Sequence, residues 1–524
     1  PVASRIFGAL TLALAAPIAV WSIGGLEQPL AACLLAWAIV MCLRITSDPQ
    51  APAKSIWIAS ACLGLLAITR PDGIMFTAAL VVAISAVKGI NIETLRLSLK
   101  LISFPVVFFL GQLVFRLIYY GEWVANVALV KISPSWHHAG TGAEYLGGGL
   151  LSLSPLSEVA LLFVLFMVLL PSHFDKASRQ RILFLTIPAL LWSGYLVFIG
   201  GDYFPAWRHF TLLLPIMALV IVEASAWLLN YTTGLARTVI FYLFWILCFV
   251  GLVLVQFSDS RNRVAAEEMW EWDGEVVGMM LKKGFGKYQP LLAVEAAGCI
   301  PYWSDLPSLD MVGLNDYYLP RHPPEDFGQA WIGHELGEGD YVLGREPDLI
   351  IFGSPRGSAG ALLRSGLEMQ GTQEFFDQYT MTTFEAKTPR ACQSQIWVRR
   401  FSARIGIEVT DSSITIPAYL INGGPKTTAY LNEAGDFLVS ITGDRWGGVG
   451  NLQLPAGDWS LRVNPAEAVK VTVRFRESGD LLLDDITPCT LTLADSSIVD
   501  VTLIPARKPR VEIQQFVFMR LPQT

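Results

Sequence analysis

Hydropathy changes abruptly near residue 257, and this change limits the folds that are open to the chain. Up to that residue the sequence is a series of apolar blocks of membrane-spanning length. A hydrocarbon layer about 30 Å thick takes roughly 20 residues of helix to cross. After residue 257 no block of this length occurs. Residues 1–257 are therefore expected to form a polytopic α-helical membrane bundle, followed by a soluble region.

Composition agrees with a membrane protein and excludes nucleic acid as a partner. Hydrophobic residues make up 53% of the chain and charged residues only 16%, whereas charged residues are about a quarter of an ordinary soluble domain. The formal net charge of −7 provides no basic face of the kind that binds a phosphate backbone. We therefore expect membrane lipid around this chain, and no nucleic acid.

About nine membrane spans are predicted in the first part of the chain. Their approximate bounds are 5–23, 28–43, 55–70, 73–88, 101–119, 152–171, 182–200, 209–229 and 238–257. Most Lys and Arg residues fall in the connections on one side, which the positive-inside rule makes cytoplasmic. The other side has only Arg70, Lys131 and Arg208, with Arg116 one turn inside a span. The soluble tail is predicted to lie on this outer side.

The soluble tail has two textures. Residues 258–402 mix short apolar runs with a helical stretch, which indicates a small extracytoplasmic α/β unit. Residues 403–524 alternate between apolar and polar, as in Val469–Phe475, and turn signals separate the alternating runs. Alternation is the period of a half-buried strand, so this end is predicted to be a β-sandwich-like domain. Trp446 in this domain is either a stacking surface for a sugar or a buried core residue.

Two short segments place charges at the outer ends of predicted spans. Glu27 lies at the centre of Gly24–Leu30, and Arg70 and Asp72 lie in a tight turn that continues to Gly73. An acidic residue at the start of a helix also complements the helix dipole, and Arg70 can pair with Asp72. A structural role and a binding role therefore both remain open for these residues.

The densest polar signal is the segment Gly200–His209. Its glycines permit close approach of the backbone to a ligand, and its aromatic side chains can stack on a sugar. Asp202 can accept hydrogen bonds from sugar hydroxyls, and Arg208 can hold a phosphate with two hydrogen bonds. The alternative is an aromatic belt at the membrane interface. We favour the binding site.

Residues 119–145 are predicted to be a loop that brings Lys131 to the same outer side. We interpret His137 and His138 as ordinary loop residues, because no third ligand has the spacing of a zinc site. No cofactor is identified, and a requirement for a divalent metal stays open. The chain has no Walker-type glycine loop. An activated substrate is therefore expected to be carried on a lipid.

Taken together, in this order and on this side, these segments resemble the GT-C glycosyltransferases. The branch they resemble most contains the terminal arabinofuranosyltransferases of the mycobacterial cell wall. The resemblance rests on Gly24–Leu30, Arg70–Gly73, Gly200–Asp202 followed by Arg208, and the tail segments 297–303, 309–316, 332–335 and 345–350. It covers most of the chain up to about residue 350.

This resemblance implies an inverting membrane glycosyltransferase of the bacterial cytoplasmic membrane. Such an enzyme moves a sugar from a polyprenyl-phosphate donor to a cell-envelope glycan acceptor on the outer face. The substrate-binding residues it implies are Glu27, Arg70, Asp72, Lys131, Asp202 and Arg208. Members of the family carry the catalytic carboxylate in a loop upstream of Gly24. Because the chain starts at Pro1, we expect that carboxylate to lie in a missing N-terminal segment.

The alternative function is a non-catalytic polytopic protein, either a lipid-glycan transporter or a binding protein. A transporter is expected to show polar or broken helices near the middle of the membrane. In this sequence the charges lie at the predicted outer edge instead, which favours the enzyme.

Overall fold

The computed structural model describes residues 2–48, 50–131, 133–421, 428–442 and 447–522. The chain folds into two compact units. The first comprises Pro1–Glu268 with Gly328–Ile332, and the second comprises Met269–Phe327 with Gly333–Thr524. Trp446 lies outside the described residues, so both interpretations of it stay open.

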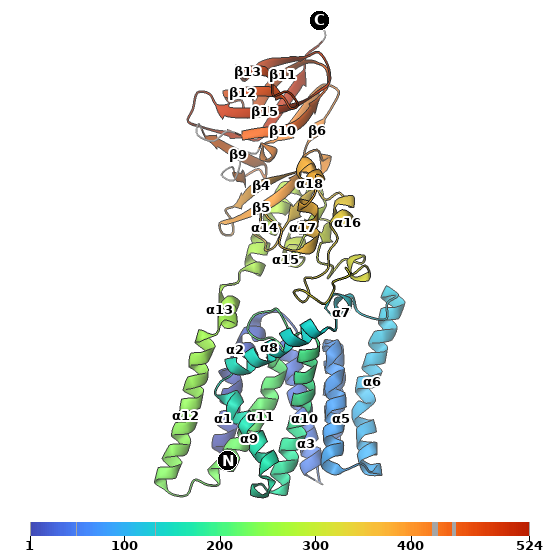
Figure 1. Cartoon of the computed structure of the whole chain (residues 1–524), viewed down its shortest axis with the longest axis vertical. Helices are drawn as coiled ribbons and strands as arrows, with labels where there is room; N and C mark the ends of the chain where they lie inside the picture. The colour runs from blue at the N-terminus through green and yellow to red at the C-terminus, as the bar shows by residue number, and fades with distance from the viewer. Residues whose placement is uncertain (1, 49, 132, 422–427, 443–446, 523–524) are drawn as a thin grey trace. The chain divides into compact units, whose positions relative to one another are not determined.

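The first unit is a bundle of helices (Figure 1). Its α-helices are α1 (Val2–Ala13), α2 (Ala16–Ile23), α3 (Gln28–Ser47), α4 (Lys54–Thr69), α5 (Ile74–Lys88), α6 (Ile92–Tyr120), α7 (Asn126–Lys131), α8 (Trp136–Ser152), α9 (Leu156–Leu169), α10 (Lys176–Phe198), α11 (Phe210–Leu229), α12 (Leu235–Ser258) and α13 (Ser260–Glu267). Two short 3₁₀ turns, η1 (Pro71–Gly73) and η2 (Pro171–His173), join neighbouring helices. Many of the helix ends follow familiar capping chemistry. Asn91, for example, accepts a hydrogen bond from Thr94 N at the start of α6, and Gly121 ends that helix in the left-handed conformation.

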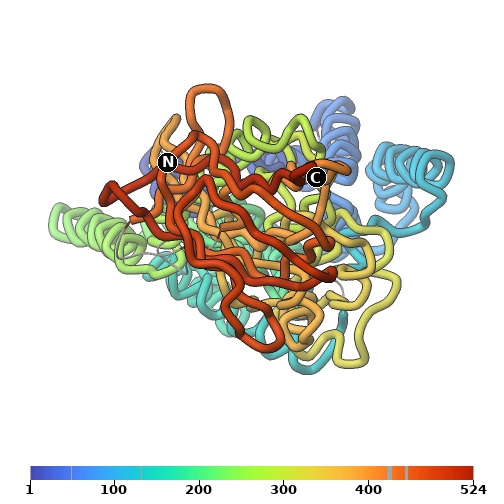
Figure 2. Tube along the Cα trace, turned by 90° about the horizontal axis from the view of Figure 1, so that it is seen from above, coloured from blue at the N-terminus to red at the C-terminus, as the bar shows by residue number. Residues whose placement is uncertain are grey.

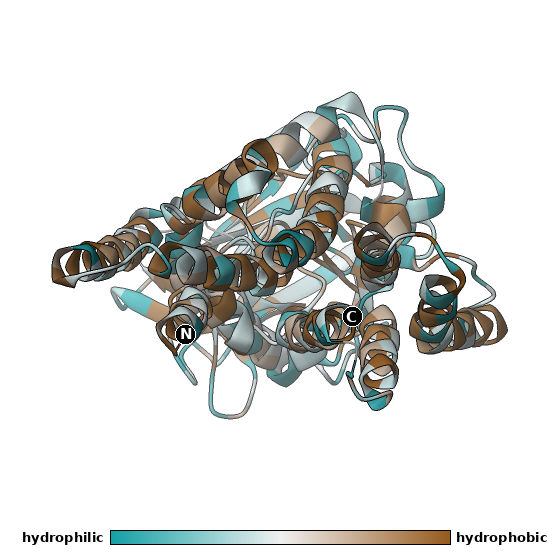
Figure 3. Cartoon of the chain, turned by 90° about the horizontal axis from the view of Figure 1, so that it is seen from below, coloured by the Kyte–Doolittle hydropathy of each residue, from teal (hydrophilic) through white to brown (hydrophobic). Residues whose placement is uncertain are grey.

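Apolar residues dominate the helices of this bundle, which are largely brown in Figure 3, and many of these residues are exposed. Only 11% of the most apolar window of α6 and 28% of that of α12 are buried inside the protein. Soluble monomers rarely expose apolar patches of this extent. The bundle therefore has the surface of a multi-pass membrane protein.

The structure does not confirm the predicted number of spans. The described residues contain six helices that are long and apolar enough to cross a membrane, or up to eight if each of two bent helix pairs counts as one span. Helices α1 and α2 meet at 55° and α8 and α9 at 104°, whereas α4 is shorter than the test requires. Proline explains both bends, because Pro17 and Pro155 have no N–H to continue a helical ladder. Nine straight spans are thus not confirmed.

The loop predicted over residues 119–145 is also corrected, because most of it is helical. Helix α7 occupies Asn126–Lys131, and α8 begins at Trp136. Ser135 caps α8 by accepting a hydrogen bond from His138 N at 3.0 Å. His137 and His138 are therefore first-turn residues of a helix, and the His138 side chain is buried, with Nδ1 2.8 Å from Ser133 O.

The second unit contains three sheets (Figure 2). Its first strands are β1 (Leu292–Val294), β2 (Ser308–Asp310), β3 (Leu349–Ile351), β4 (Tyr379–Ala386), β5 (Cys392–Arg399), β6 (Glu408–Val409), β7 (Ser413–Pro417), β8 (Thr428–Leu431) and β9 (Phe437–Thr442). The later strands are β10 (Gly447–Leu454), β11 (Gly457–Asn464), β12 (Val469–Phe475), β13 (Leu481–Ile486), β14 (Cys489–Leu493), β15 (Ser497–Pro505), β16 (Arg510–Ile513) and β17 (Gln515–Arg520). Helices α14 (Trp270–Phe285), α15 (Cys299–Ser304), α16 (Gly339–Gly344), α17 (Arg364–Gln370) and α18 (Gln373–Gln378) complete the unit.

One sheet is mixed and the other two form a sandwich. The mixed sheet has eight strands in the order β16-β9-β8-β4-β5-β3-β1-β2. A four-stranded sheet, β10-β15-β12-β13, and a five-stranded sheet, β14-β11-β17-β7-β6, share one hydrophobic core. Val469, Val471 and Val473 of β12 are all fully buried, as the alternation in the sequence predicts.

The mixed sheet draws strands from both sides of the boundary predicted between residues 402 and 403. Strands β1 to β5 come from the predicted α/β segment, whereas β8, β9 and β16 come from the predicted β-rich segment. Phe384 and Phe437, one from each segment, pack with ring centroids 4.9 Å apart. Backbone pairing and one shared core therefore join the two predicted segments into one unit.

Candidate functional site

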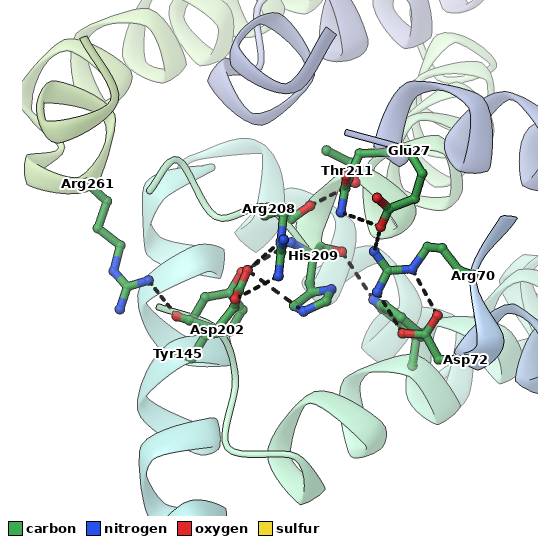
Figure 4. A network of polar contacts seen from close by, with 11 residues as sticks. Glu27, Arg70, Asp72, Tyr145, Asp202, Arg208, His209, Thr211 and Arg261 are labelled. Carbon is green, nitrogen blue, oxygen red and sulfur yellow. Dashed lines mark hydrogen bonds and ion pairs between the residues drawn. The ribbon is translucent and has the colours of Figure 1, made fainter. Parts of the chain in front are cut away.

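The residues predicted to bind substrate lie at junctions between helices of the first unit. Glu27 precedes α3, and Arg70 and Asp72 lie between α4 and α5. Asp202 and Arg208 lie between α10 and α11, and Lys131 is the last residue of α7. Electrostatic interactions reach Lys131 from Glu27, Arg70, Asp202 and Arg208. The structure thus places five of the six residues in a polar network of two ion-pair clusters, Glu27–Arg70–Asp72 and Asp202–Arg208, which Figure 4 shows. Lys131 adjoins the second cluster through the Phe204 ring, over which Arg208 also lies.

The first cluster in this network is built around Arg70. Its guanidinium donates to both carboxylate oxygens of Asp72, at 2.9 and 2.7 Å, and to Glu27 Oε1 at 2.7 Å. The turn that holds Arg70 packs closely against α4: a Cβ on Gly73 would lie only 2.6 Å from Leu66 O. Glycine is thus required where η1 enters α5, and the turn fixes Asp72 beside Arg70.

The second cluster is built around Asp202 and Arg208, which form a bidentate ion pair. Arg208 Nε lies 2.7 Å from Asp202 Oδ2, and Arg208 Nη2 lies 2.9 Å from Oδ1. The Asp202 side chain is only 4% exposed. Gly201 has φ 82° and packs against Tyr145, so close that a Cβ would lie 2.5 Å from the Tyr145 side chain. The glycines therefore let this loop bury its carboxylate against α8.

Backbone strain marks the same loop. Ala206 and Trp207 both have φ 49°, a left-handed conformation that side chains other than glycine rarely adopt. Strain of this kind costs on the order of 1–3 kcal/mol per residue and gathers at functional sites. Contacts from α13 hold the loop in place. Arg261 donates to Asp202 O at 3.0 Å and lies over the Trp207 ring, and Trp207 Nε1 donates to Asp259 at 3.0 Å.

His209 is buried beside this ion pair. Its Nε2 lies 3.8 Å from Asp202 Oδ2, a distance at which a protonated ring would form an ion pair. Burial, together with the nearby Arg70, Arg208 and Lys131, holds the pKa of His209 well below its usual range. The ring is therefore neutral at pH 7, and we interpret the contact with Asp202 as packing.

Lys131 differs from the two arginines because it is not neutralised by a carboxylate. Among the described residues no carboxylate lies within ion-pair distance of its Nζ. The ammonium lies instead over the rings of Tyr203 and Phe204, 5.3 and 5.8 Å from their centroids. Burial lowers the pKa of Lys131, and Arg208 lowers it further, whereas Asp202 raises it.

An aromatic cluster and an apolar groove adjoin these cations. Arg208 Cζ lies 4.1 Å from the Phe204 ring centroid and 5.7 Å from that of Trp21. Trp21 also lines a groove of about 200 Å³ between α1, α2, α3 and α11. The other lining residues include Leu12, Ile18, Pro29, Thr211 and Pro215. Thr211 donates to Arg208 O at 2.8 Å, so the groove begins directly beside the second cluster.

Sequence reasoning missed Trp21, Tyr145, His209 and Arg261 as parts of this network. Tyr145 was placed in a loop, whereas it is a buried residue of α8 whose hydroxyl lies 3.2 Å from His209 N. Arg261 comes after the last span, where nothing in its spacing connects it with Asp202. One signal could have pointed to Trp21. It precedes Glu27 by less than two helical turns, so the sequence already places it near the same outer side of the bundle.

Comparisons with known proteins add little to this geometry. Residues 264–401 match a family model described as a domain of unknown function (DUF8728), and no curated protein matches the chain. Among solved structures, the cryo-EM structure of the arabinofuranosyltransferase AftD from Mycobacteria is similar, with 9% sequence identity and a TM-score of 0.30. That similarity covers 98% of this chain and 52% of the other, so this chain spans about half the length of AftD. A TM-score of 0.30 is too low to establish a common fold.

Proposed function

We propose that this chain belongs to a membrane glycosyltransferase that moves a sugar from a polyprenyl-phosphate donor to a cell-envelope glycan acceptor. The observation that carries the proposal is a pair of cations, Lys131 and Arg208, that both lie over the Phe204 ring. Arg208 also lies over Trp21, which lines an apolar groove. A polyprenyl-phosphate sugar has an anionic head and a long apolar chain. Cations next to an apolar groove in a membrane bundle match both parts.

In this proposal Lys131 and Arg208 contact the donor phosphate. A phosphate that leaves with its lipid gains negative charge in the transition state, and fixed cations stabilise that charge. Arg70 and Arg208 are already paired with carboxylates, so Lys131 brings the charge that the network does not balance internally. Glu27, Asp72 and Asp202 orient those arginines or accept hydrogen bonds from sugar hydroxyls.

The prenyl chain occupies the groove lined by Trp21, Pro29 and Pro215. Apolar surface of the prenyl chain that is removed from water there stabilises the bound donor by about 25 cal/mol per Å². The aromatic rings of Tyr203 and Phe204, which lie under the Lys131 ammonium, provide a stacking surface for the sugar.

The base that deprotonates the acceptor hydroxyl is not assigned to a residue of this chain. Such a base needs a free carboxylate oxygen within hydrogen-bond reach of the hydroxyl. Glu27, Asp72 and Asp202 each accept hydrogen bonds from a guanidinium, and in Asp72 and Asp202 both oxygens are occupied. These carboxylates are therefore proposed as orienting groups.

Lys131→Met tests the donor site with little risk to folding, because removing this ammonium leaves no carboxylate without its partner. We expect the affinity for a polyprenyl-phosphate sugar in lipid nanodiscs to fall by about 1.5–3 kcal/mol, the range for a hydrogen bond to a charged group. Lys88→Met is the matched control, since Lys88 is also the last residue of a helix but is exposed. Equal donor affinity in the wild type and Lys131→Met would refute the proposed phosphate contact.

The same site predicts a pH dependence. The ammonium form of Lys131 binds the phosphate, and the pKa of this group is lowered in the free protein. Donor affinity is therefore expected to decrease as the pH rises through that lowered pKa, below the range where an ordinary lysine titrates. Lys131→Arg should bind donor without this decrease, because arginine stays charged throughout.

Orientation is a further part of the proposal. We place the second unit and the polar network on the outer face of a bacterial cytoplasmic membrane, as the distribution of Lys and Arg predicts. Protease added to intact spheroplasts is then expected to remove the region after α12. Full protection of that region, with cleavage only after lysis, would contradict this orientation and place the region on the cytoplasmic side.

A further inference from the structure

The second unit contains a cavity of about 410 Å³ that shares no residue with the network described above. It lies beside the segment that follows β5 and is closed by residues of β7, β10 and β15. Most of its walls are apolar, with Ile414, Ile416, Val449 and Ile498 among them. A volume of this size is within the range of about 300–1,000 Å³ that is usual for small-molecule sites.

Among the described residues, one cation, Arg400, lines this cavity. Its backbone N donates to Gln378 O at 2.8 Å, which fixes the residue beside α18. Unlike the backbone N–H of this residue, its guanidinium has neither a hydrogen-bond acceptor nor an ion-pair partner among the described residues. The Nε atom is fully buried and unpaired.

The nearest carboxylates do not neutralise this guanidinium. Asp377 and Asp500 act on it only at a distance, and Asp500 is already paired with Arg476 at 3.2 Å. Burial lowers the pKa of Arg400, and the positive charge of Arg476 lowers it further. The preceding residue provides a contrast, because Arg399 lies 2.9 Å from Glu346.

An isolated charge removed from water is costly unless an opposite charge or hydrogen bonds compensate it. Other arginines of the second unit, such as Arg356, Arg364 and Arg390, form ion pairs with carboxylates. The absence of such a partner therefore distinguishes Arg400 from them. The cavity also offers polar groups near the charge. Asn451 and Gln453 line it, and Asn451 is held in a left-handed conformation, φ 59°, with its N–H donated to Asp500 at 3.0 Å.

We propose that this cavity binds a small organic carboxylate with an apolar body, whose acidic group pairs with the guanidinium of Arg400. The carboxylate accepts from the two Nη groups of the guanidinium in the bidentate geometry that suits arginine. The apolar body lies against the walls from β7, β10 and β15. Asn451 and Gln453 bind polar substituents at the rim.

The test uses two probes of the same shape, 4-tert-butylbenzoate and the neutral 4-tert-butylbenzamide, with the full chain in lipid nanodiscs. Heats of binding are measured by titration calorimetry, and empty nanodiscs correct for partition into lipid. We expect saturable binding of the benzoate and at least tenfold weaker binding of the benzamide. Equal binding of both probes, or no saturable binding of the benzoate, would overturn the proposal.

Substitutions then locate the charge. Arg400→Met should weaken benzoate binding at least tenfold, Arg400→Lys should retain part of it, and Arg399→Met, one residue away, should leave it unchanged. Without ligand, Arg400→Met should unfold at the same temperature as the wild type or higher, because it removes a partly buried charge that no described carboxylate pairs. A lower unfolding temperature together with unchanged benzoate affinity would show that Arg400 serves the fold alone. Neither readout needs donor or acceptor, so the outcome is independent of the proposed transferase activity.

Discussion

Replacing Arg70 by alanine is expected to lower the free energy of unfolding by about 3–5 kcal/mol. Breaking a buried ion pair on one side has a cost of this size, because it leaves the opposite charge buried without a partner. Here one guanidinium serves Asp72 and Glu27, and the side chains of Arg70 and Asp72 are 10% and 12% exposed. Chemical unfolding in detergent, followed by tryptophan fluorescence, measures the loss.

Arg237→Ala is the control for this experiment. Arg237 lies on the exposed surface of α12 and donates only to Thr233 at 3.2 Å, so its removal should change stability by no more than about 0.5 kcal/mol. Arg70→Met with Asp72→Asn should recover most of the stability, since it removes both members of the more buried pair. If Arg70→Ala unfolds no more readily than Arg237→Ala, the first cluster does not hold α3 and the α4–α5 turn together.

Arg208→Ala is expected to produce two losses, one of stability and one of donor affinity. The Asp202 side chain, only 4% exposed, would remain buried without its bidentate partner, which costs about 3–5 kcal/mol of stability. Donor affinity should fall by about 1.5–3 kcal/mol, the range for a charged hydrogen bond. Unfolding and donor-lipid binding in nanodiscs measure the two losses separately.

Adding Asp202→Asn to this variant distinguishes a structural role from a role in donor binding. Arg208→Ala with Asp202→Asn removes the stranded carboxylate, so stability should return toward that of the wild type. Donor affinity should stay low, because the cation is still absent. If donor affinity recovers along with stability, Arg208 acts only as the partner of Asp202, and the phosphate contact proposed for it is wrong.

The apolar character of the first unit was readable from the sequence, and so was the alternation in the last strands of the second unit. Runs such as Phe210–Leu229 are apolar on every face, which is typical of helices in lipid. In β12, the alternation of Val469, Val471 and Val473 has the period of a strand, and local sequence is sufficient to predict it. The charged segments at the helix junctions were also apparent from the sequence, because charge next to a membrane-length apolar run is conspicuous.

Other features depended on contacts between residues far apart in sequence. Arg261 lies 59 positions from Asp202 and reaches its carbonyl only because α13 folds back over the α10–α11 loop. Pro17 and Pro155 are visible in the sequence, but the angles of 55° and 104° between the helices at these prolines are seen only in the structure. The predicted boundary at residue 402 failed to divide the second unit because strand pairing is long-range, and β8 finds its partner in β4.

The sequence by itself determined which residues carry charge at the helix junctions, because apolar length, residue type and side of the bundle are local properties. Only the tertiary structure decided how those charges are paired. Arg70 and Arg208 are neutralised by buried carboxylates, whereas Lys131 and Arg400 are not. Pairing depends on distances of a few ångströms between separate segments, and Coulomb energies and desolvation vary steeply over such distances. That difference between paired and unpaired cations is the basis of the ligand that we propose for each site.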